Sequence, residues 1–227
     1  YIVREPPAEV LCLYEGQGRN AVHLAAAGHR CVAVDTSPVG LAKARLLAEQ
    51  RGVSVGRLTT LEADLSRWVP PTATYDAVVS IFGTASPAER ARLHQACVTA
   101  LRPGGVAIVQ MFATRHSQAR GGRACGPPSS HLAAPATVAA ELAGLDVVVC
   151  EEVPVRLHEG RFHRGLAVLC NVVARKRADA ARPSSRYRHM LDAVFREAAD
   201  EETFAREVGA HGVANDAAAV AAAAAAA

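Results

Sequence analysis

The chain has 227 residues and a mass of 23.7 kDa, enough for one domain with a full core. Hydrophobic residues make up 50%, charged residues 21%, and the formal net charge is +3, a composition that excludes a disordered chain and gives no sign of a nucleic-acid-binding surface. No internal apolar stretch approaches the roughly 20 residues of a membrane span and no signal peptide opens the chain, so we expect a cytoplasmic protein.

The first elements alternate strands and helices. Residues 10–14 are an apolar run that predicts a buried strand, and residues 20–27 predict a helix that ends at Gly28. Residues 31–34 are rich in β-forming side chains and predict a second strand, which Asp35 closes. The spacing of these elements is that of a β-α-β unit.

The middle of the chain continues the alternation. Ser37 can cap a helix whose first position suits Pro38 and which runs to about residue 50. Residues 58–61 predict a weak third strand. Residues 75–82 are apolar along nearly their whole length, which is typical of a strand buried on both faces of a parallel sheet.

A capping box opens the next predicted helix. Ser86 and Glu89 have the spacing of that motif, and the helix continues to residue 101. The Arg-Pro-Gly-Gly segment at residues 102–105 should break it, and residues 106–112 predict a fifth strand.

The last elements complete an α/β domain. A loop rich in Gly, Pro and Ser spans residues 114–130, a helix is predicted at 136–142, and two strands follow at 147–155 and 166–173. Because the connection between these strands is short, they should form an antiparallel hairpin at one edge. We therefore predict a Rossmann-like, doubly wound, mostly parallel seven-stranded sheet with an antiparallel edge hairpin and helices on both faces.

The loop at residues 15–21 lies where an open α/β sheet binds ligands, just beyond the first strand. Gly16 and Gly18 carry no Cβ, so the backbone there can turn tightly and approach a ligand closely. The Gly-x-Gly-x-x-Ala pattern alone fits a dinucleotide as well as S-adenosylmethionine, and a plain strand-to-helix turn also stays open.

Acidic residues near this loop favour S-adenosylmethionine. Asp35 can accept hydrogen bonds from both ribose hydroxyls and would repel the 2′-phosphate of NADP. Glu15 would repel a pyrophosphate but attract an ammonium group. Asp64 can accept from an adenine amino group while Leu65 packs against the ring.

These motifs resemble those of the class I S-adenosylmethionine-dependent methyltransferases, closest to the small branch of tellurite-resistance and thiopurine-type enzymes. The resemblance covers about residues 9–175 and rests on residues 15–21, 33–37, 63–65, 75–80 and 101–105. It implies S-adenosylmethionine as cofactor, bound by residues of four loops. These are Glu15, Gly16, Gln17, Gly18, Arg19, Asn20, Asp35, Thr36, Ser37, Asp64, Leu65, Ser80, Ile81 and Phe82.

The sequence departs from the family pattern at three places. Cys12 stands where many members carry an acidic residue, and Tyr14 stands where they carry a further glycine. Only residues 1–9 precede the first strand and residue 1 is not Met, so we expect a fragment, a processed form or a trimmed chain. Two alternative functions remain open: an NAD-dependent dehydrogenase and a non-catalytic cofactor-binding scaffold of the same fold.

Methyl transfer needs mainly alignment of the acceptor and exclusion of water, so no catalytic residue need be recognisable in the sequence. Weak catalytic candidates are Phe82, which with Thr84 follows the fourth strand, His116 after the fifth strand, and His163 between the last two strands. We expect a small-molecule acceptor, because the chain lacks a target-recognition domain and a basic stripe beside the cofactor loops. No nucleic-acid or membrane partner is expected.

The six cysteines form no Cys-x-x-Cys pair, and most lie in apolar runs where a reduced thiol behaves as a small hydrophobe. We therefore expect neither a disulfide framework nor a metal site. Beyond the methyltransferase domain at residues 1–175 we predict a basic and then amphipathic helical extension at 176–208 and an Ala-rich tail at 209–227. The sequence indicates no function for either segment.

Overall fold

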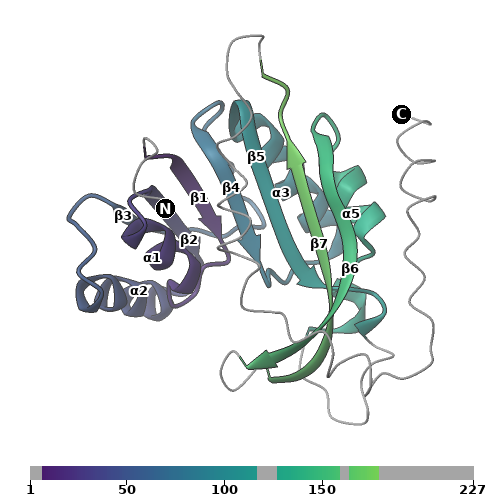
Figure 1. The fold of residues 1–227 in the computed structure, drawn as a ribbon, viewed down its shortest axis with the longest axis horizontal. Helices are drawn as coiled ribbons and strands as arrows, with labels where there is room; N and C mark the ends of the chain where they lie inside the picture. The colour runs from purple at the N-terminus through teal and green to yellow at the C-terminus, as the bar shows by residue number, and fades with distance from the viewer. Residues whose placement is uncertain (1–6, 117–126, 159–163, 179–227) are drawn as a thin grey trace.

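The computed structural model describes residues 7–116, 127–158 and 164–178 of the chain. Seven strands form one sheet in the order β3-β2-β1-β4-β5-β7-β6 (Figure 1). The strands are β1 (Glu9–Leu13), β2 (Arg30–Asp35), β3 (Leu58–Glu62), β4 (Tyr75–Ile81), β5 (Leu101–Phe112), β6 (Asp146–His158) and β7 (Arg164–Arg175).

The directions of the strands confirm the predicted fold class. β1 pairs in parallel with β2 and β4, and the parallel pairs β2–β3 and β4–β5 extend the sheet on either side. β7 is antiparallel to both β5 and β6, so the predicted hairpin lies at one edge of the sheet, with β7 inside it and β6 outermost. The order reverses between β1 and β4, which is where an open α/β sheet binds ligands.

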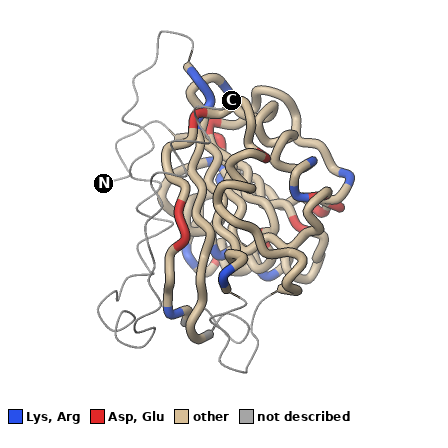
Figure 2. Tube along the Cα trace, turned by 90° about the vertical axis from the view of Figure 1, so that its right-hand side faces the viewer, with Lys and Arg blue, Asp and Glu red and all other residues tan. Residues whose placement is uncertain are grey.

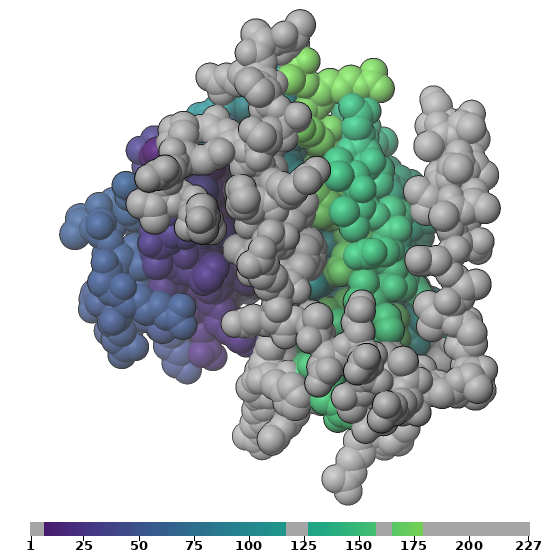
Figure 3. All heavy atoms as spheres, in the orientation of Figure 1, coloured from purple at the N-terminus to yellow at the C-terminus, as the bar shows by residue number. Residues whose placement is uncertain are grey.

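Helices cover both faces of the sheet (Figure 1). Apolar side chains of α1 and α2 pack in one core cluster, and those of α3 and α5 pack in another. In the space-filling view, the purple and blue early elements and the green β6 and α5 form opposite flanks (Figure 3). The helices are α1 (Arg19–Ala26), α2 (Pro38–Gln50), α3 (Pro87–Ala100) and α5 (Pro135–Glu141), with a short 3-10 helix, η2 (Ser129–His131).

Side-chain caps mark the starts of two of these helices, at the predicted residues. The Ser37 hydroxyl accepts a hydrogen bond from the backbone N–H of Gly40 at 3.0 Å, and Pro38 occupies the first turn of α2. Ser86 and Glu89 form the predicted reciprocal capping box at the start of α3. These caps fix the points at which the chain leaves β2 and β4 and enters the next helix.

One boundary differs from the prediction. The segment 102–105, expected to be a break before the fifth strand, lies within β5, and α3 ends at Ala100. Tyr75 pairs with Leu101 but Ala77 pairs with Val106, so the intervening residues form an irregularity inside a continuous strand pair. Gly104, with φ at +79°, supplies the left-handed conformation that this excursion requires.

The start of the predicted basic extension packs on the domain. The Lys176 ammonium donates to the carbonyls of Val98 and Leu101 at 2.8 Å each, at the end of α3 where carbonyls lack helical partners. The exposed guanidinium of Arg177 pairs with Asp146 at 3.1 Å. Residues 179–208 and the Ala-rich tail lie outside the described residues, so the predicted division of the chain stays a prediction. Within the described residues, no helix is both long and apolar enough for a membrane span.

Candidate functional site

The turn after β1 is shaped by close packing. Tyr14 and Gly18 both have positive φ, +54° and +85°, and Gly18 forms the N-cap of α1. A Cβ on Gly18 would lie 2.5 Å from the Ala44 Cβ on α2, so only glycine fits between the two helices. The loop therefore brings the start of α1 close to α2 and places the end of β1 beside the end of β2.

The Glu15 carboxylate organises this loop from within. Its side chain is 6% exposed, and Oε1 accepts a hydrogen bond of 2.7 Å from the backbone N–H of Ala21. Burial raises the pKa of Glu15 to about 7, although hydrogen bonds from the first turn of α1 oppose the shift. The carboxylate thus faces the start of α1, and its predicted contact with an ammonium group stays a prediction.

Asp35 ties the end of β2 to the same loop. One carboxylate oxygen accepts from the backbone N–H of Gly16 at 2.9 Å, and the other accepts from that of Ser37 at 2.8 Å. Each carboxylate oxygen can accept more than one hydrogen bond, so both keep capacity for a ligand. The geometry is compatible with the predicted ribose contact.

The segment after β3 is fixed by its own turn and by α3. Asp64 accepts a hydrogen bond of 2.9 Å from the backbone N–H of Ser66, and the hydrogen bonds from Ser66 hold the pKa of Asp64 below its usual range. Arg92, from α3, donates to the backbone carbonyls of Leu65 and Trp68. Sequence reasoning missed Arg92, because a side chain that binds distant carbonyls leaves no local pattern.

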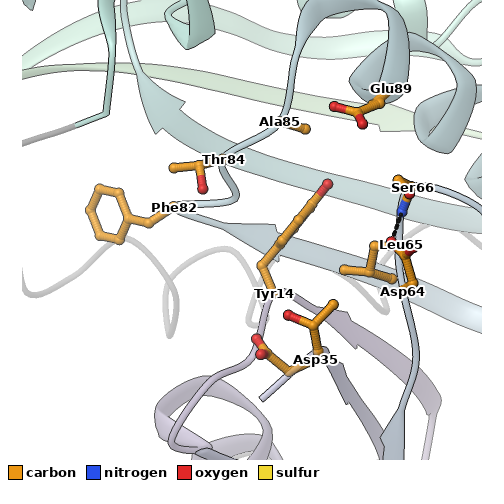
Figure 4. A pocket seen from close by; sticks show the side chains of 10 residues that line it. Tyr14, Asp35, Asp64, Leu65, Ser66, Phe82, Thr84, Ala85 and Glu89 are labelled. Carbon is orange, nitrogen blue, oxygen red and sulfur yellow. Dashed lines mark hydrogen bonds between the residues drawn. The ribbon is translucent and has the colours of Figure 1, made fainter.

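These segments line an open cavity of about 400 Å³ beyond the carboxyl ends of β1, β2, β3 and β4 (Figure 4). Five predicted cofactor-site residues line it. The full lining is Tyr14, Asp35, Thr36, Asp64, Leu65, Ser66, Phe82, Thr84, Ala85 and Glu89. Three of these ten residues are carboxylates and none is basic. Within the described residues, no cluster of His, Cys, Asp or Glu could hold a metal ion.

The other predicted cofactor residues lie behind or beside the cavity and do not line it. They are Glu15, Gly16, Gln17, Gly18, Arg19, Asn20, Ser37, Ser80 and Ile81. Sequence reasoning missed Ser66, Ala85 and Glu89, and it treated Tyr14 only as a departure from the family pattern. The capping box could have revealed Glu89, because it places this carboxylate in the first turn of the helix that follows β4.

Aromatic rings extend from the cavity along the end of β5. The ring centroids of Phe82 and Phe112 are 5.2 Å apart, and those of Phe112 and His116 are 4.6 Å apart. Of the two catalytic candidates within the described residues, only Phe82 lines the cavity. His116 is 1% exposed and its Nδ1 accepts from the backbone N–H of Val168, so its catalytic role stays a prediction. His163 lies outside the described residues.

Comparison with known proteins agrees with this geometry. Residues 10–105 match the family described as Methyltransferase domain. A Methanosarcina mazei protein described as a SAM-dependent methyltransferase has a similar structure, with a TM-score of 0.60 at 16% identity over 78% of this chain and 96% of that one. TehB from Haemophilus influenzae has a TM-score of 0.59 at 19% identity, over 75% of this chain and 58% of that one.

A third similar structure is described as the [4+2]-cyclase SpnF, with a TM-score of 0.60 at 18% identity over 78% of this chain and 77% of that one. No curated protein matches the chain in sequence. The structural likenesses show the fold, and the family match adds the methyltransferase domain. Both agree with the resemblance predicted from the sequence: residues 10–105 match a methyltransferase domain, and the fold is shared with proteins described as S-adenosylmethionine-dependent methyltransferases.

Proposed function

We propose that this chain, which has the fold and the domain match of an S-adenosylmethionine-dependent methyltransferase, transfers a methyl group in line to a small-molecule acceptor. The observation that carries the proposal is the acidic cavity at the switch point of the sheet, lined by Asp35, Asp64 and Glu89. Ligands of doubly wound sheets bind at this place.

The charge of the cavity suits this cofactor better than a dinucleotide. S-adenosylmethionine carries a sulfonium and an ammonium against one carboxylate, so its net charge is positive, whereas the pyrophosphate of NAD is doubly negative. The three carboxylates attract the first and repel the second. The chemistry of the lining residues therefore fits S-adenosylmethionine.

Asp35 and Asp64 would hold the ribose and the adenine, with Leu65 against the ring, as the resemblance implies. When bound, the cofactor supplies a methyl group made electrophilic by the sulfonium. Phe82 and Tyr14 form apolar walls that would help to exclude water once the cofactor and the acceptor fill the cavity. Thr84 and Glu89 are among the polar side chains of the lining that are available to orient an acceptor, and a soft anionic acceptor requires no general base.

Three observations support a small acceptor. The cavity has a volume of about 400 Å³, most of which the cofactor would fill, so only a compact acceptor has room beside it. Lys and Arg are interspersed with Asp and Glu along the described trace and form no continuous stripe in the view of Figure 2. Two similar structures concern echinomycin biosynthesis and a [4+2]-cyclase, both small-molecule chemistry. A cytoplasmic location stays a prediction.

Calorimetry with S-adenosylmethionine, S-adenosylhomocysteine and NAD tests the cofactor. We expect both sulfur compounds to bind and NAD to fail; binding of NAD alone would move the protein to the dehydrogenase class. Replacing Asp35 with alanine should cost about 1–3 kcal/mol of binding free energy, because the ribose loses a charged acceptor. Glu62, the partner of Asp35 in the β2–β3 register, does not line the cavity, so Glu62→Ala is the matched control.

Binding without turnover would favour the scaffold. If the chain binds the cofactor but transfers no methyl group to any member of a broad acceptor panel, the non-catalytic alternative stands.

A further inference from the structure

Tyr14 occupies an unusual position at the end of β1. Its φ of +54° lies in the left-handed region, which side chains other than glycine rarely adopt. Phe82, at the end of the neighbouring strand β4, also has a φ of +54°. Both aromatic residues therefore leave their strands in a strained conformation, and both line the cavity.

The ring of Tyr14 is seated by a close approach to Gly83. A Cβ on Gly83 would lie 2.4 Å from Cδ2 and 2.7 Å from Cε2 of the tyrosine. Any other residue at position 83 would collide with the ring, so the absence of a side chain there creates the place that Tyr14 fills. The strain at Tyr14 and the glycine opposite it form one local arrangement.

The ring stands in the middle of the cavity (Figure 4). Asp35, Asp64, Leu65 and Ser66 lie to one side of it in this view, and Phe82 and Thr84 lie to the other. If the two aspartates hold the ribose and the adenine, the rest of the cofactor must pass the tyrosine to reach Phe82. The sulfonium is the cationic centre of that remaining part.

We propose that the ring of Tyr14 is a specificity-determining residue of the cofactor site, which recognises the positive charge of S-adenosylmethionine through its π face. The inference rests on the proposed function. An aromatic face attracts a cation within about 6 Å of its centroid, and the attraction grows when both are shielded from water. S-adenosylhomocysteine lacks the positive charge at sulfur, so the ring favours the substrate form of the cofactor over the product form.

The hydroxyl of Tyr14 is not required for this recognition. Burial raises the pKa of Tyr14 to about 12, so the phenol stays neutral at neutral pH and supplies no negative charge. The attraction comes from the ring, and a phenylalanine should replace the tyrosine without loss. This separates the proposal from a role of Tyr14 as a base or as a hydrogen-bonding group.

Calorimetry of the wild type and of Tyr14→Phe, Tyr14→Leu and Phe82→Leu tests the proposal, with S-adenosylmethionine and S-adenosylhomocysteine as ligands. The quantity measured is the ratio of the two dissociation constants. We expect Tyr14→Phe to keep the wild-type ratio within about twofold, and Tyr14→Leu to shift it against S-adenosylmethionine by about threefold to thirtyfold. Thermal melting of each variant checks that it is folded.

Gly83→Ala gives an independent test, since its Cβ displaces the ring while the tyrosine is still present. It should shift the ratio in the same direction as Tyr14→Leu, and adding it to Tyr14→Leu should have little further effect. The proposal is overturned if Tyr14→Leu weakens the binding of both ligands equally, or if S-adenosylmethionine binds more tightly once the ring is removed. It is also overturned if Phe82→Leu shifts the ratio of dissociation constants and Tyr14→Leu does not. If the wild type binds neither ligand, the proposed function itself fails.

Discussion

A buried carboxylate at the start of α1 makes the glycine loop sensitive to pH. Glu15 has a pKa raised from its usual value of 4.5 to about 7 because it is buried, although Ala21 donates a hydrogen bond to it. Between these two pH values the unfolded chain has released the proton while the folded chain still holds it. The free energy of unfolding therefore falls as pH rises through this window.

We predict that this residue costs the wild type roughly 3 kcal/mol of stability between about pH 4.5 and about pH 7. Glu15→Gln keeps a carbonyl oxygen as acceptor for the Ala21 N–H but cannot ionise. The difference between the variant and the wild type in denaturant unfolding should grow across that window and level off above it. A constant difference at all pH values would show that Glu15 titrates normally. Glu62→Gln, which changes an exposed carboxylate, is the control.

At the scale of elements, a buried ionic cluster joins α3 to α5. Arg90 donates to both carboxylate oxygens of Glu141, at 2.9 Å from Nε and 2.7 Å from Nη2, and His94 lies 2.8 Å from the same carboxylate. The side chains of Arg90 and Glu141 are 7% and 10% exposed. The cluster orients α5, which packs against β6 and β7, relative to the helix that begins at the cavity.

Removing one member leaves the others buried without their partner. We predict that Glu141→Ala lowers the free energy of unfolding by about 3–5 kcal/mol, because the guanidinium of Arg90 loses its counter-ion in a desolvated place. Asp146→Ala breaks the exposed pair with Arg177 and should cost at most about 1 kcal/mol. Thermal or denaturant unfolding of the two variants measures both. Equal losses would mean that the cluster contributes no more than a surface ion pair.

Most of the helices and strands could be predicted from the sequence. Caps and apolar runs act within a few residues, so Ser37 and Ser86 marked the starts of α2 and α3 correctly. The helix ends before the break predicted at residues 102–105, but the fifth strand starts earlier than predicted, because β5 already pairs with β4 at Leu101 and pairs with it again from Val106. Tertiary pairing overrides the local preference of proline and glycine there.

The sequence predicted the site residues that directly follow strands, and it missed those whose role depends on contacts between distant residues. Asp35 and Asp64 follow strands, and both line the cavity as the sequence suggested. Arg92 donates to backbone carbonyls that are more than twenty residues away in the sequence. The position of the Tyr14 ring depends on Gly83, which follows the end of another strand. Such pairings arise only when the sheet brings its strands together.

For the whole molecule, the sheet order and the charge distribution bear on the acceptor. Because the strand order reverses between β1 and β4, the cavity lies beyond the carboxyl ends of the central strands. Loops from both halves of the domain line it. Its acidic lining disfavours a polyanion such as RNA, whose phosphates the carboxylates would repel. A neutral or cationic nucleophile meets no such barrier, and a compact anion with a single charge meets a much smaller one than a polyanion does.

We therefore predict that label from S-adenosyl-[methyl-³H]methionine passes to a small molecule. The assay offers thiols, metalloid salts, small amines, total RNA and protein extract separately, and follows label in each fraction. Asp35→Ala should lower transfer at subsaturating cofactor and recover part of it at high cofactor concentration, because the change weakens binding of the ribose. Glu62→Ala should behave as the wild type. Label found only in RNA or protein would refute the prediction and direct attention to the basic residues from Arg175 onward.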